Sequence, residues 1–209
     1  MKRVTLAIIF ASFTLVLAAQ DAIRVNYKGA QPTISDFVSA LVDHNLNAVD
    51  EEECCNESFE AASRAGDRHR KGLPLEEGET VTVDEKNGYV VYEYRSEYES
   101  TENVLRVEMC YWNEADKKHK LFACNTVAFT NGKYDPGQYD ALIFYRYDIA
   151  TKKMKQWDDT GVDFVYRSDD DVMGSYALPR AGKDITVTLW YKSGKKQKTL
   201  KWNGRRFVH

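Results

Sequence analysis

The sequence predicts an α+β fold, with two N-terminal helices followed by a mostly antiparallel, hairpin-rich sheet or a partly closed barrel. Three observations predict it. Apolar residues recur at helical spacing near the N-terminus, they alternate with polar residues from about residue 80 onward, and turn-forming dipeptides separate the alternating runs. The chain has 209 residues with 12 Gly and 4 Pro, and no long linker divides it. We therefore expect one α+β domain over residues 20–209, with helices over about 33–70 and strands over about 80–208.

Residues 1–19 are typical of a cleaved signal peptide. Lys2 and Arg3 give a short basic start, and an uncharged, mostly apolar run extends from Val4 to Ala18. This run is shorter than the ~20 residues that span a bilayer, which disfavours the alternative of an N-terminal membrane anchor. Cleavage removes two positive charges and no negative one, which takes the formal net charge from −3 to −5. We expect export to the periplasm or the cell exterior, with no stable membrane insertion after cleavage.

The helices are predicted from their ends and their apolar stripes. Thr33, followed three residues later by Asp36, is a capping-box pattern that predicts a helix start. The apolar stripe of this helix consists of Ile34, Phe37, Val38, Leu41, Val42 and Leu46. A second helix is expected over about 51–65, because an acidic first turn and a basic end suit the helix dipole.

The alternating pattern from Thr80 onward predicts a series of short strands. Asn-Gly, Ser-Gly and Asp-Pro-Gly turns separate several of them. The predicted strands are 80–84, 88–96, 103–112, 120–130, 140–148, 153–157, 162–167, 173–178, 184–192 and 197–202. A further short strand through Ile23 and Val25 is expected before the first helix.

The chain has four cysteines, which are Cys54, Cys55, Cys110 and Cys124. An oxidising compartment favours disulfides. Pairing Val107 with Val127 on neighbouring antiparallel strands places Cys110 opposite Cys124, within disulfide range. We therefore predict a disulfide between these two, with two small buried thiols as the alternative. For Cys54 and Cys55, separate thiols or a partner elsewhere stay open, because a bond between neighbours needs a strained peptide.

Three hairpins share a tyrosine before the turn and several lysines after it. Tyr and Trp combine an apolar body with a polar tip, which suits contact with sugars or peptides. The residues predicted to form a binding surface are Tyr147, Trp157, Tyr191, Trp202, Lys195, Lys196 and Lys198. The alternative is that the lysines protect strand edges from self-pairing and that the aromatic residues fill the core.

Catalytic signatures are missing from the sequence. It has no GxSxG, HExxH, P-loop or GxGxxG motif, and its four histidines lie far apart, as surface histidines do. We therefore predict no catalytic residue, no metal site and no cofactor. The alternative function is an exported hydrolase whose carboxylates meet only in the fold, and such carboxylates could also bind calcium. The candidates are Asp158, Asp159, Asp163, Asp169, Asp170 and Asp171.

The chain ends in a distinctive run, Thr199-Leu200-Lys201-Trp202-Asn203-Gly204-Arg205-Arg206-Phe207. With the signal peptide, the helices and the tyrosine-rich hairpins, its Trp-Asn-Gly-x-x-Phe ending resembles exported β-rich proteins of gut-type Gram-negative bacteria. This resemblance implies no activity. We predict an exported soluble binding or interaction protein with an unknown protein or polysaccharide partner, and a structural envelope component is a further possibility. A net charge of −3 gives no electrostatic case for nucleic acid.

Overall fold

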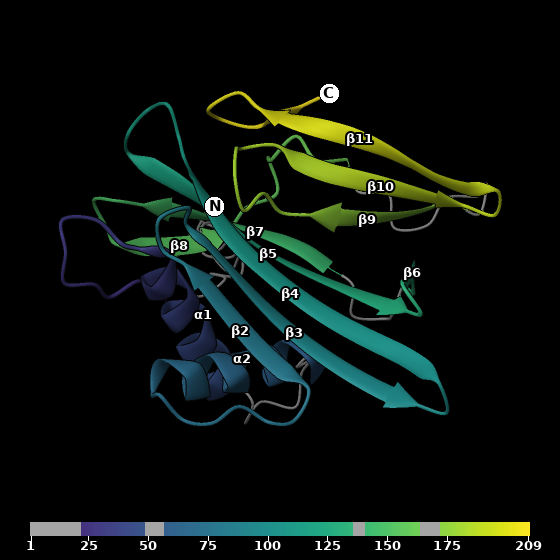
Figure 1. Cartoon of the computed structure of the whole chain (residues 1–209). Helices are drawn as coiled ribbons and strands as arrows, with labels where there is room; N and C mark the ends of the chain where they lie inside the picture. The colour runs from purple at the N-terminus through teal and green to yellow at the C-terminus, as the bar shows by residue number, and fades with distance from the viewer. Residues whose placement is uncertain (1–21, 49–56, 136–140, 164–171) are drawn as a thin grey trace, which may run out of the picture.

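The computed structural model describes residues 22–48, 57–135, 141–163 and 172–209. The large curled sheet carries the helices on one face and a small second sheet on the other (Figure 1). The predicted signal peptide, the pair Cys54 and Cys55, and the run Asp169 to Asp171 lie outside the described residues. The antiparallel, strand-rich character that the sequence predicts is confirmed, but the strands form two sheets.

The helical layer consists, within the described ranges, of α1 (Ile34–Ala48) and α2 (Glu57–Arg70). The start of α1 follows the capping pattern, because the backbone N–H of Thr33 donates to Asp36 Oδ2 over 2.7 Å. Its apolar stripe faces the sheet, with Ile34, Phe37 and Leu41 almost completely buried. Burial of this stripe against the sheet supplies most of the helix stability.

The large sheet has the strand order β1-β8-β7-β5-β4-β3-β2, with β6 paired to β5, and every pair is antiparallel. Its strands are β1 (Ile23–Arg24), β2 (Glu79–Asp84), β3 (Tyr89–Tyr98), β4 (Thr101–Asn113), β5 (His119–Thr130), β6 (Lys133–Tyr134), β7 (Ala141–Asp148) and β8 (Lys153–Gln156). The predicted Asn-Gly turn joins β5 to β6, and both Asn131 and Gly132 have positive φ, as a type I′ hairpin requires.

The second sheet has the order β12-β11-β10-β9. Its strands are β9 (Met173–Ala177), β10 (Ile185–Tyr191), β11 (Gly194–Trp202) and β12 (Phe207–Val208). The predicted strand over 162–167 is wrong at its start, because residues 162 and 163 are irregular, and its remaining residues lie outside the described ranges. None of the described helices is long and apolar enough to cross a membrane.

Most of the large sheet is buried on both faces, which creates two cores. The helix-side core contains, among others, Phe37, Leu41, Val107, Met109, Phe122, Tyr147 and Met154. The inter-sheet core contains, among others, Trp112, Leu121, Phe144, Ile185, Val187, Leu200 and Phe207. Side chains alternate between the two faces of a strand, so most of β5 is buried along its length.

A buried carboxylate lies between the two sheets. Glu108 is 5% exposed, and its Oε1 accepts a hydrogen bond from the Tyr89 hydroxyl at 3.0 Å. Its Oε2 accepts from Leu178 N at 2.9 Å and from Asn125 Nδ2 at 3.2 Å. Asn125 Nδ2 also donates to the Tyr176 carbonyl at 2.8 Å. Burial raises the pKa of Glu108, and these donors oppose that shift by stabilising the ionised form. The network connects β3, β4 and β5 to the second sheet.

The predicted disulfide is wrong. Cys110 and Cys124 are free buried thiols. The register is shifted by one residue from the predicted one, so Cys110 lies opposite Ala123 and Cys124 lies opposite Met109. A shift of one residue turns a side chain to the other face of a strand. Cys124 therefore belongs to the helix-side core and Cys110 to the inter-sheet core, where they cannot reach each other.

Candidate functional site

The seven residues of the predicted binding surface do not form one surface. Tyr147 is completely buried against Phe37, so its prediction as a surface residue is wrong; its strand lies between the helices and the second sheet. Trp202 is half-buried and packs on Trp112 of the inter-sheet core. The residues that stay exposed on the β10–β11 hairpin are Tyr191, Lys195, Lys196 and Lys198. Trp157 is half-buried and lies at a different place, beside a groove of the large sheet.

A strip of cationic side chains crosses the large sheet at β1, β8 and β7. The register pairs Arg24 with Lys153 and Lys155 with Arg146. Strand alternation places Arg146, Lys153 and Lys155 on the face opposite the helices, whereas Arg24 lines a separate hollow with α1 residues that include Asp36 and Asp43. Among the described residues, β8 contributes no side chain to the inter-sheet core, so this part of the face is open. Both lysines are exposed there.

Arg146, Lys153 and Lys155 form one wall of a groove of about 500 Å³, which we call the cationic groove. The residues lining it are Ala22, His119, Arg146, Asp148, Thr151, Lys153, Lys155, Gln156 and Trp157. Arg146 and Lys155 are directly opposed on neighbouring strands. Like charges in such a pair destabilise a sheet, and an anion between them removes the repulsion. Glu114 offsets the charge of Arg146 and Asp148 lies opposite Lys153, so Lys155 is the cation of this wall without a carboxylate directly beside it among the described residues.

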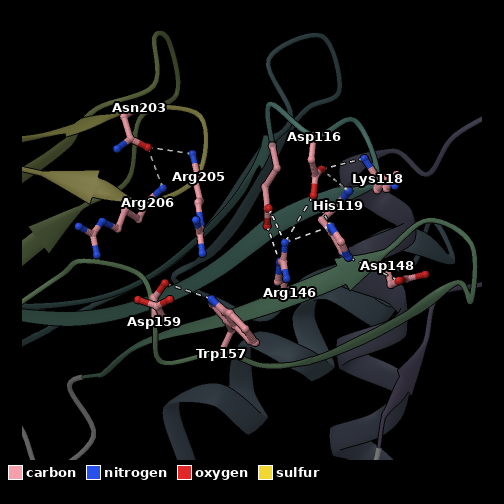
Figure 2. Close-up of polar contacts among 11 residues, drawn as sticks. Asp116, Lys118, His119, Arg146, Asp148, Trp157, Asp159, Asn203, Arg205 and Arg206 are labelled. Carbon is pink, nitrogen blue, oxygen red and sulfur yellow. Dashed lines mark hydrogen bonds and ion pairs between the residues drawn. The ribbon is translucent and has the colours of Figure 1, made fainter.

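Arg146 is held rigidly although it carries the central charge of the groove. Its Nε donates to Glu114 Oε1 at 2.8 Å and its Nη2 donates to Glu114 Oε2 at 2.7 Å, which is a bidentate pair. The Arg146 guanidinium also lies 5.0 Å above the ring of Trp157. The Trp157 indole is fixed in turn, because its Nε1 donates to the Asp159 carbonyl at 3.1 Å. Figure 2 shows Arg146 between the tip of the β4–β5 hairpin and Trp157.

His119 lies between two carboxylates at the end of the groove. Its Nδ1 is 2.6 Å from Asp116 Oδ2, and its Nε2 is 3.5 Å from Asp148 Oδ2. The hydrogen bond to His119 and two backbone amides lower the pKa of Asp116 to about 2. Hydrogen bonds from Thr151 lower the pKa of Asp148. Both carboxyls are therefore ionised at neutral pH, and neither holds a proton that a general acid could donate.

Glu114, Asp116 and His119 have the ligand types of a metal centre, and their ligand atoms lie within 4.8 Å of one another. However, Arg146 already occupies this cluster: it forms the bidentate pair with Glu114 and lies 3.6 Å from Asp116. The guanidinium satisfies Glu114, whose side chain is 5% exposed. A metal ion would have to displace it. The cluster fits an ion-pair network that fixes Arg146 better than it fits a metal site.

The C-terminal Trp-Asn-Gly-x-x-Phe run forms the turn between β11 and β12. Asn203 Oδ1 accepts from the backbone N–H groups of Arg205 and Arg206 at 2.9 and 3.0 Å. Gly204 has φ of +97° and lies so close to Ala115 that an added Cβ would be 3.1 Å from the Ala115 Cβ. The Gly204 carbonyl accepts from Ala115 N at 2.7 Å, which ties the turn to the hairpin that carries Glu114. The motif is a structural turn that leaves two exposed arginines near this hairpin.

The acidic residues that the sequence offers for hydrolysis or calcium binding are not gathered. Asp158, Asp159 and Asp163 are exposed, and over the described ranges they form no group whose ligand atoms lie close together. Asp163 pairs with His209 at 3.3 Å. Sequence reasoning instead missed Glu114, Arg146 and the role of His119. The available signal was Arg146, a charged residue in the middle of the mostly apolar strand 141–148.

Comparison with known proteins gives no match to a family model, to a curated protein or to a solved structure. Any functional assignment therefore depends on the chemistry of the groove.

Proposed function

We propose that the chain is an exported, non-catalytic binding protein and that the cationic groove holds an acidic polysaccharide. The proposal rests mainly on one observation: Arg146 and Lys155 lie directly opposite each other on neighbouring strands, in a groove that Trp157 also lines. Export remains the expectation from residues 1–19, and N-terminal sequencing of the exported protein is its test. A mature chain that began at Met1 would contradict it.

Lys153 and Lys155 are the groups that favour an anionic ligand. Neither forms an ion pair within the described residues, and both are exposed on the groove wall. Arg146 is paired with Glu114 and orients the ligand rather than supplying free charge. Lys155 supplies attraction that the ion-pair network does not neutralise, and Lys153 lies directly opposite the ionised Asp148.

Asp148 and the neutral polar residues favour a sugar over a densely charged polymer. Asp148 is ionised and lines the same groove as the lysines, so it repels closely spaced phosphates but accepts hydrogen bonds from sugar hydroxyls. Gln156 and Thr151 add further polar groups to the lining. Trp157 contributes an apolar surface of the kind that packs against sugar rings.

The proposal is tested by titrating the protein with polygalacturonate, a polymer of uronic acid, and measuring heat of binding at two salt concentrations. The double variant Lys153→Gln, Lys155→Gln should bind about tenfold more weakly, because exposed charge pairs contribute up to about 1 kcal/mol each. The matched control, Lys195→Gln with Lys196→Gln, removes the same charge from the β10–β11 hairpin and should leave affinity unchanged. Equal loss in both variants, or no binding by the unaltered protein, would contradict the proposal.

A further inference from the structure

A second cavity lies between the helices and the part of the large sheet formed by β2, β3 and β4. Its volume is about 360 Å³. Its apolar lining consists of Val38, Val42, Ala62, Val81, Val83, Val90, Tyr92, Val107 and Met109. Its polar lining consists of Ser35, Ser39, His69 and Arg70, and Gly66 completes it. We call it the helix–sheet cavity.

The cavity arises because the helix-side core is filled unevenly. Toward β5 and β7, the ring of Phe37 packs against the rings of Phe122 and Tyr147, with centroids 5.4 and 5.1 Å away. Toward β2, valine, alanine, glycine and serine are too short to fill the space between helix and sheet. Val81 and Val83 consequently remain half-buried although they pack on the helix-side core.

The helix–sheet cavity is partly open to solvent, and Val81 and Val83 on its wall remain half-buried. Water is poorly held against its valine side chains, because an ordered water needs two to four polar partners. Apolar cavities instead take up apolar molecules, and ligand pockets are typically of ~300–1,000 Å³ with mostly apolar walls and a few polar groups. The helix–sheet cavity has both properties.

The polar residues of the cavity come from the helices. Arg70 Nη2 donates to Asp67 Oδ1 at 2.7 Å and to Asp43 Oδ1 at 3.1 Å, and its side chain is 40% exposed. Both of these bonds use Nη2, and the Arg70 guanidinium has further N–H donors on its other nitrogens. His69 and Ser39 lie on the same lining and add further polar groups. Asp43 and Asp67 already pair with the charge of Arg70, so its remaining N–H donors are what it offers to the head group of an amphiphile whose chain lies against the valines.

We propose that the helix–sheet cavity binds a single-chain aliphatic carboxylate, with its chain between the helices and β2–β4 and its carboxylate at Arg70. The site is separate from the cationic groove: no residue lines both. The proposal does not depend on polysaccharide binding, and failure at one site leaves the other unaffected.

The experiment measures binding of dodecanoate by calorimetry and by the shift in melting temperature. Val81→Phe fills the cavity from β2 and should weaken dodecanoate binding at least tenfold. The matched control is Thr82→Phe, which adds the same ring to the exposed face of the same strand and should leave binding unchanged. Arg70→Gln should weaken dodecanoate binding several-fold and leave binding of the uncharged dodecanol unaltered. This variant keeps the test valid if Val81→Phe does not fold.

The proposal is overturned if the unaltered protein binds no dodecanoate. It is also overturned if folded Val81→Phe binds dodecanoate as tightly as the unaltered protein does, or if Arg70→Gln lowers the affinities for dodecanoate and dodecanol equally. Polygalacturonate binding should be the same in Val81→Phe and in the unaltered protein, which separates the two sites.

Discussion

Glu108→Ala tests whether the hydrogen-bond network between the two sheets stabilises the fold. The substitution removes the acceptor of the Tyr89 hydroxyl and of the Leu178 N–H, and both residues are buried. Asn125 keeps its bond to the Tyr176 carbonyl. Each buried donor without a partner costs about 1–3 kcal/mol, and removal of a buried carboxylate returns part of this. We expect a loss of about 3 kcal/mol in the free energy of unfolding.

The assay is urea unfolding at pH 7, with a thermal scan as a second measurement. A loss of about 3 kcal/mol lowers the melting temperature of a domain of this size by about 6–12 °C. Glu97→Ala, at an exposed position of β3, is the matched control and should change stability by less than about 0.5 kcal/mol. A loss below about 1 kcal/mol for Glu108→Ala would refute the reasoning, because it would mean that water satisfies the orphaned donors.

Glu108→Gln separates hydrogen bonding from charge. The glutamine amide retains an oxygen for the Leu178 N–H and offers an N–H to the Tyr89 oxygen. Glu108→Gln should therefore lower the free energy of unfolding by less than Glu108→Ala does. Burial raises the folded pKa of Glu108 above its ordinary value of 4.5, so the folded state holds this proton to higher pH than the unfolded state does. The unaltered protein should therefore lose stability relative to Glu108→Gln as pH rises from about 4.5. A constant difference would contradict the raised pKa.

The remaining predictions concern three other places. Burial lowers the pKa of Lys120, so stability should rise with pH below 10.5. Lys120→Met should remove this slope, and it also removes the hydrogen bond to Asn113 Oδ1 and the contact with the Tyr111 ring; pH-dependent urea unfolding measures the slope. Glu99 and Ser100 have positive φ in the β3–β4 turn, a backbone conformation that Asn and Gly adopt more easily. The double variant Glu99→Asn, Ser100→Gly should therefore raise the free energy of unfolding by about 1 kcal/mol. An unchanged melting temperature of this variant would argue against strain in the turn. Asp116→Asn should remove the stability loss between pH 3.8 and about 2 that arises from this carboxyl, and acid titration followed by circular dichroism tests it.

The strands were predictable because their turns and alternation are local properties, but the register between β4 and β5 was not. Alternation fixes register only where one face of a sheet is buried. Here Val107 faces the helices and Val127 lies on the opposite face, so pairing the two by hydrophobicity shifts the strands by one residue. The covering of the second face by β9 to β12 depends on contacts between residues distant in sequence.

The candidate site was harder to predict than the fold. Trp157 was identified from its sequence, but its partner Arg146 and the anchor Glu114 lie on separate strands or turns and meet only through strand pairing. Tyr147 shares the same hairpin pattern as Tyr191, yet one is completely buried and the other is 41% exposed. A sequence pattern shared by several hairpins does not predict which of them the helices or the second sheet will cover.

The most direct test of the proposed function is the location of ligand contact on the folded protein. Backbone and indole chemical shifts would be recorded by NMR while polygalacturonate is added. Binding in the cationic groove predicts the largest changes at Lys153, Lys155 and the Trp157 indole, decreasing as salt is added. Changes concentrated at Lys195 and Lys196 on the β10–β11 hairpin, or no changes at all, would contradict it.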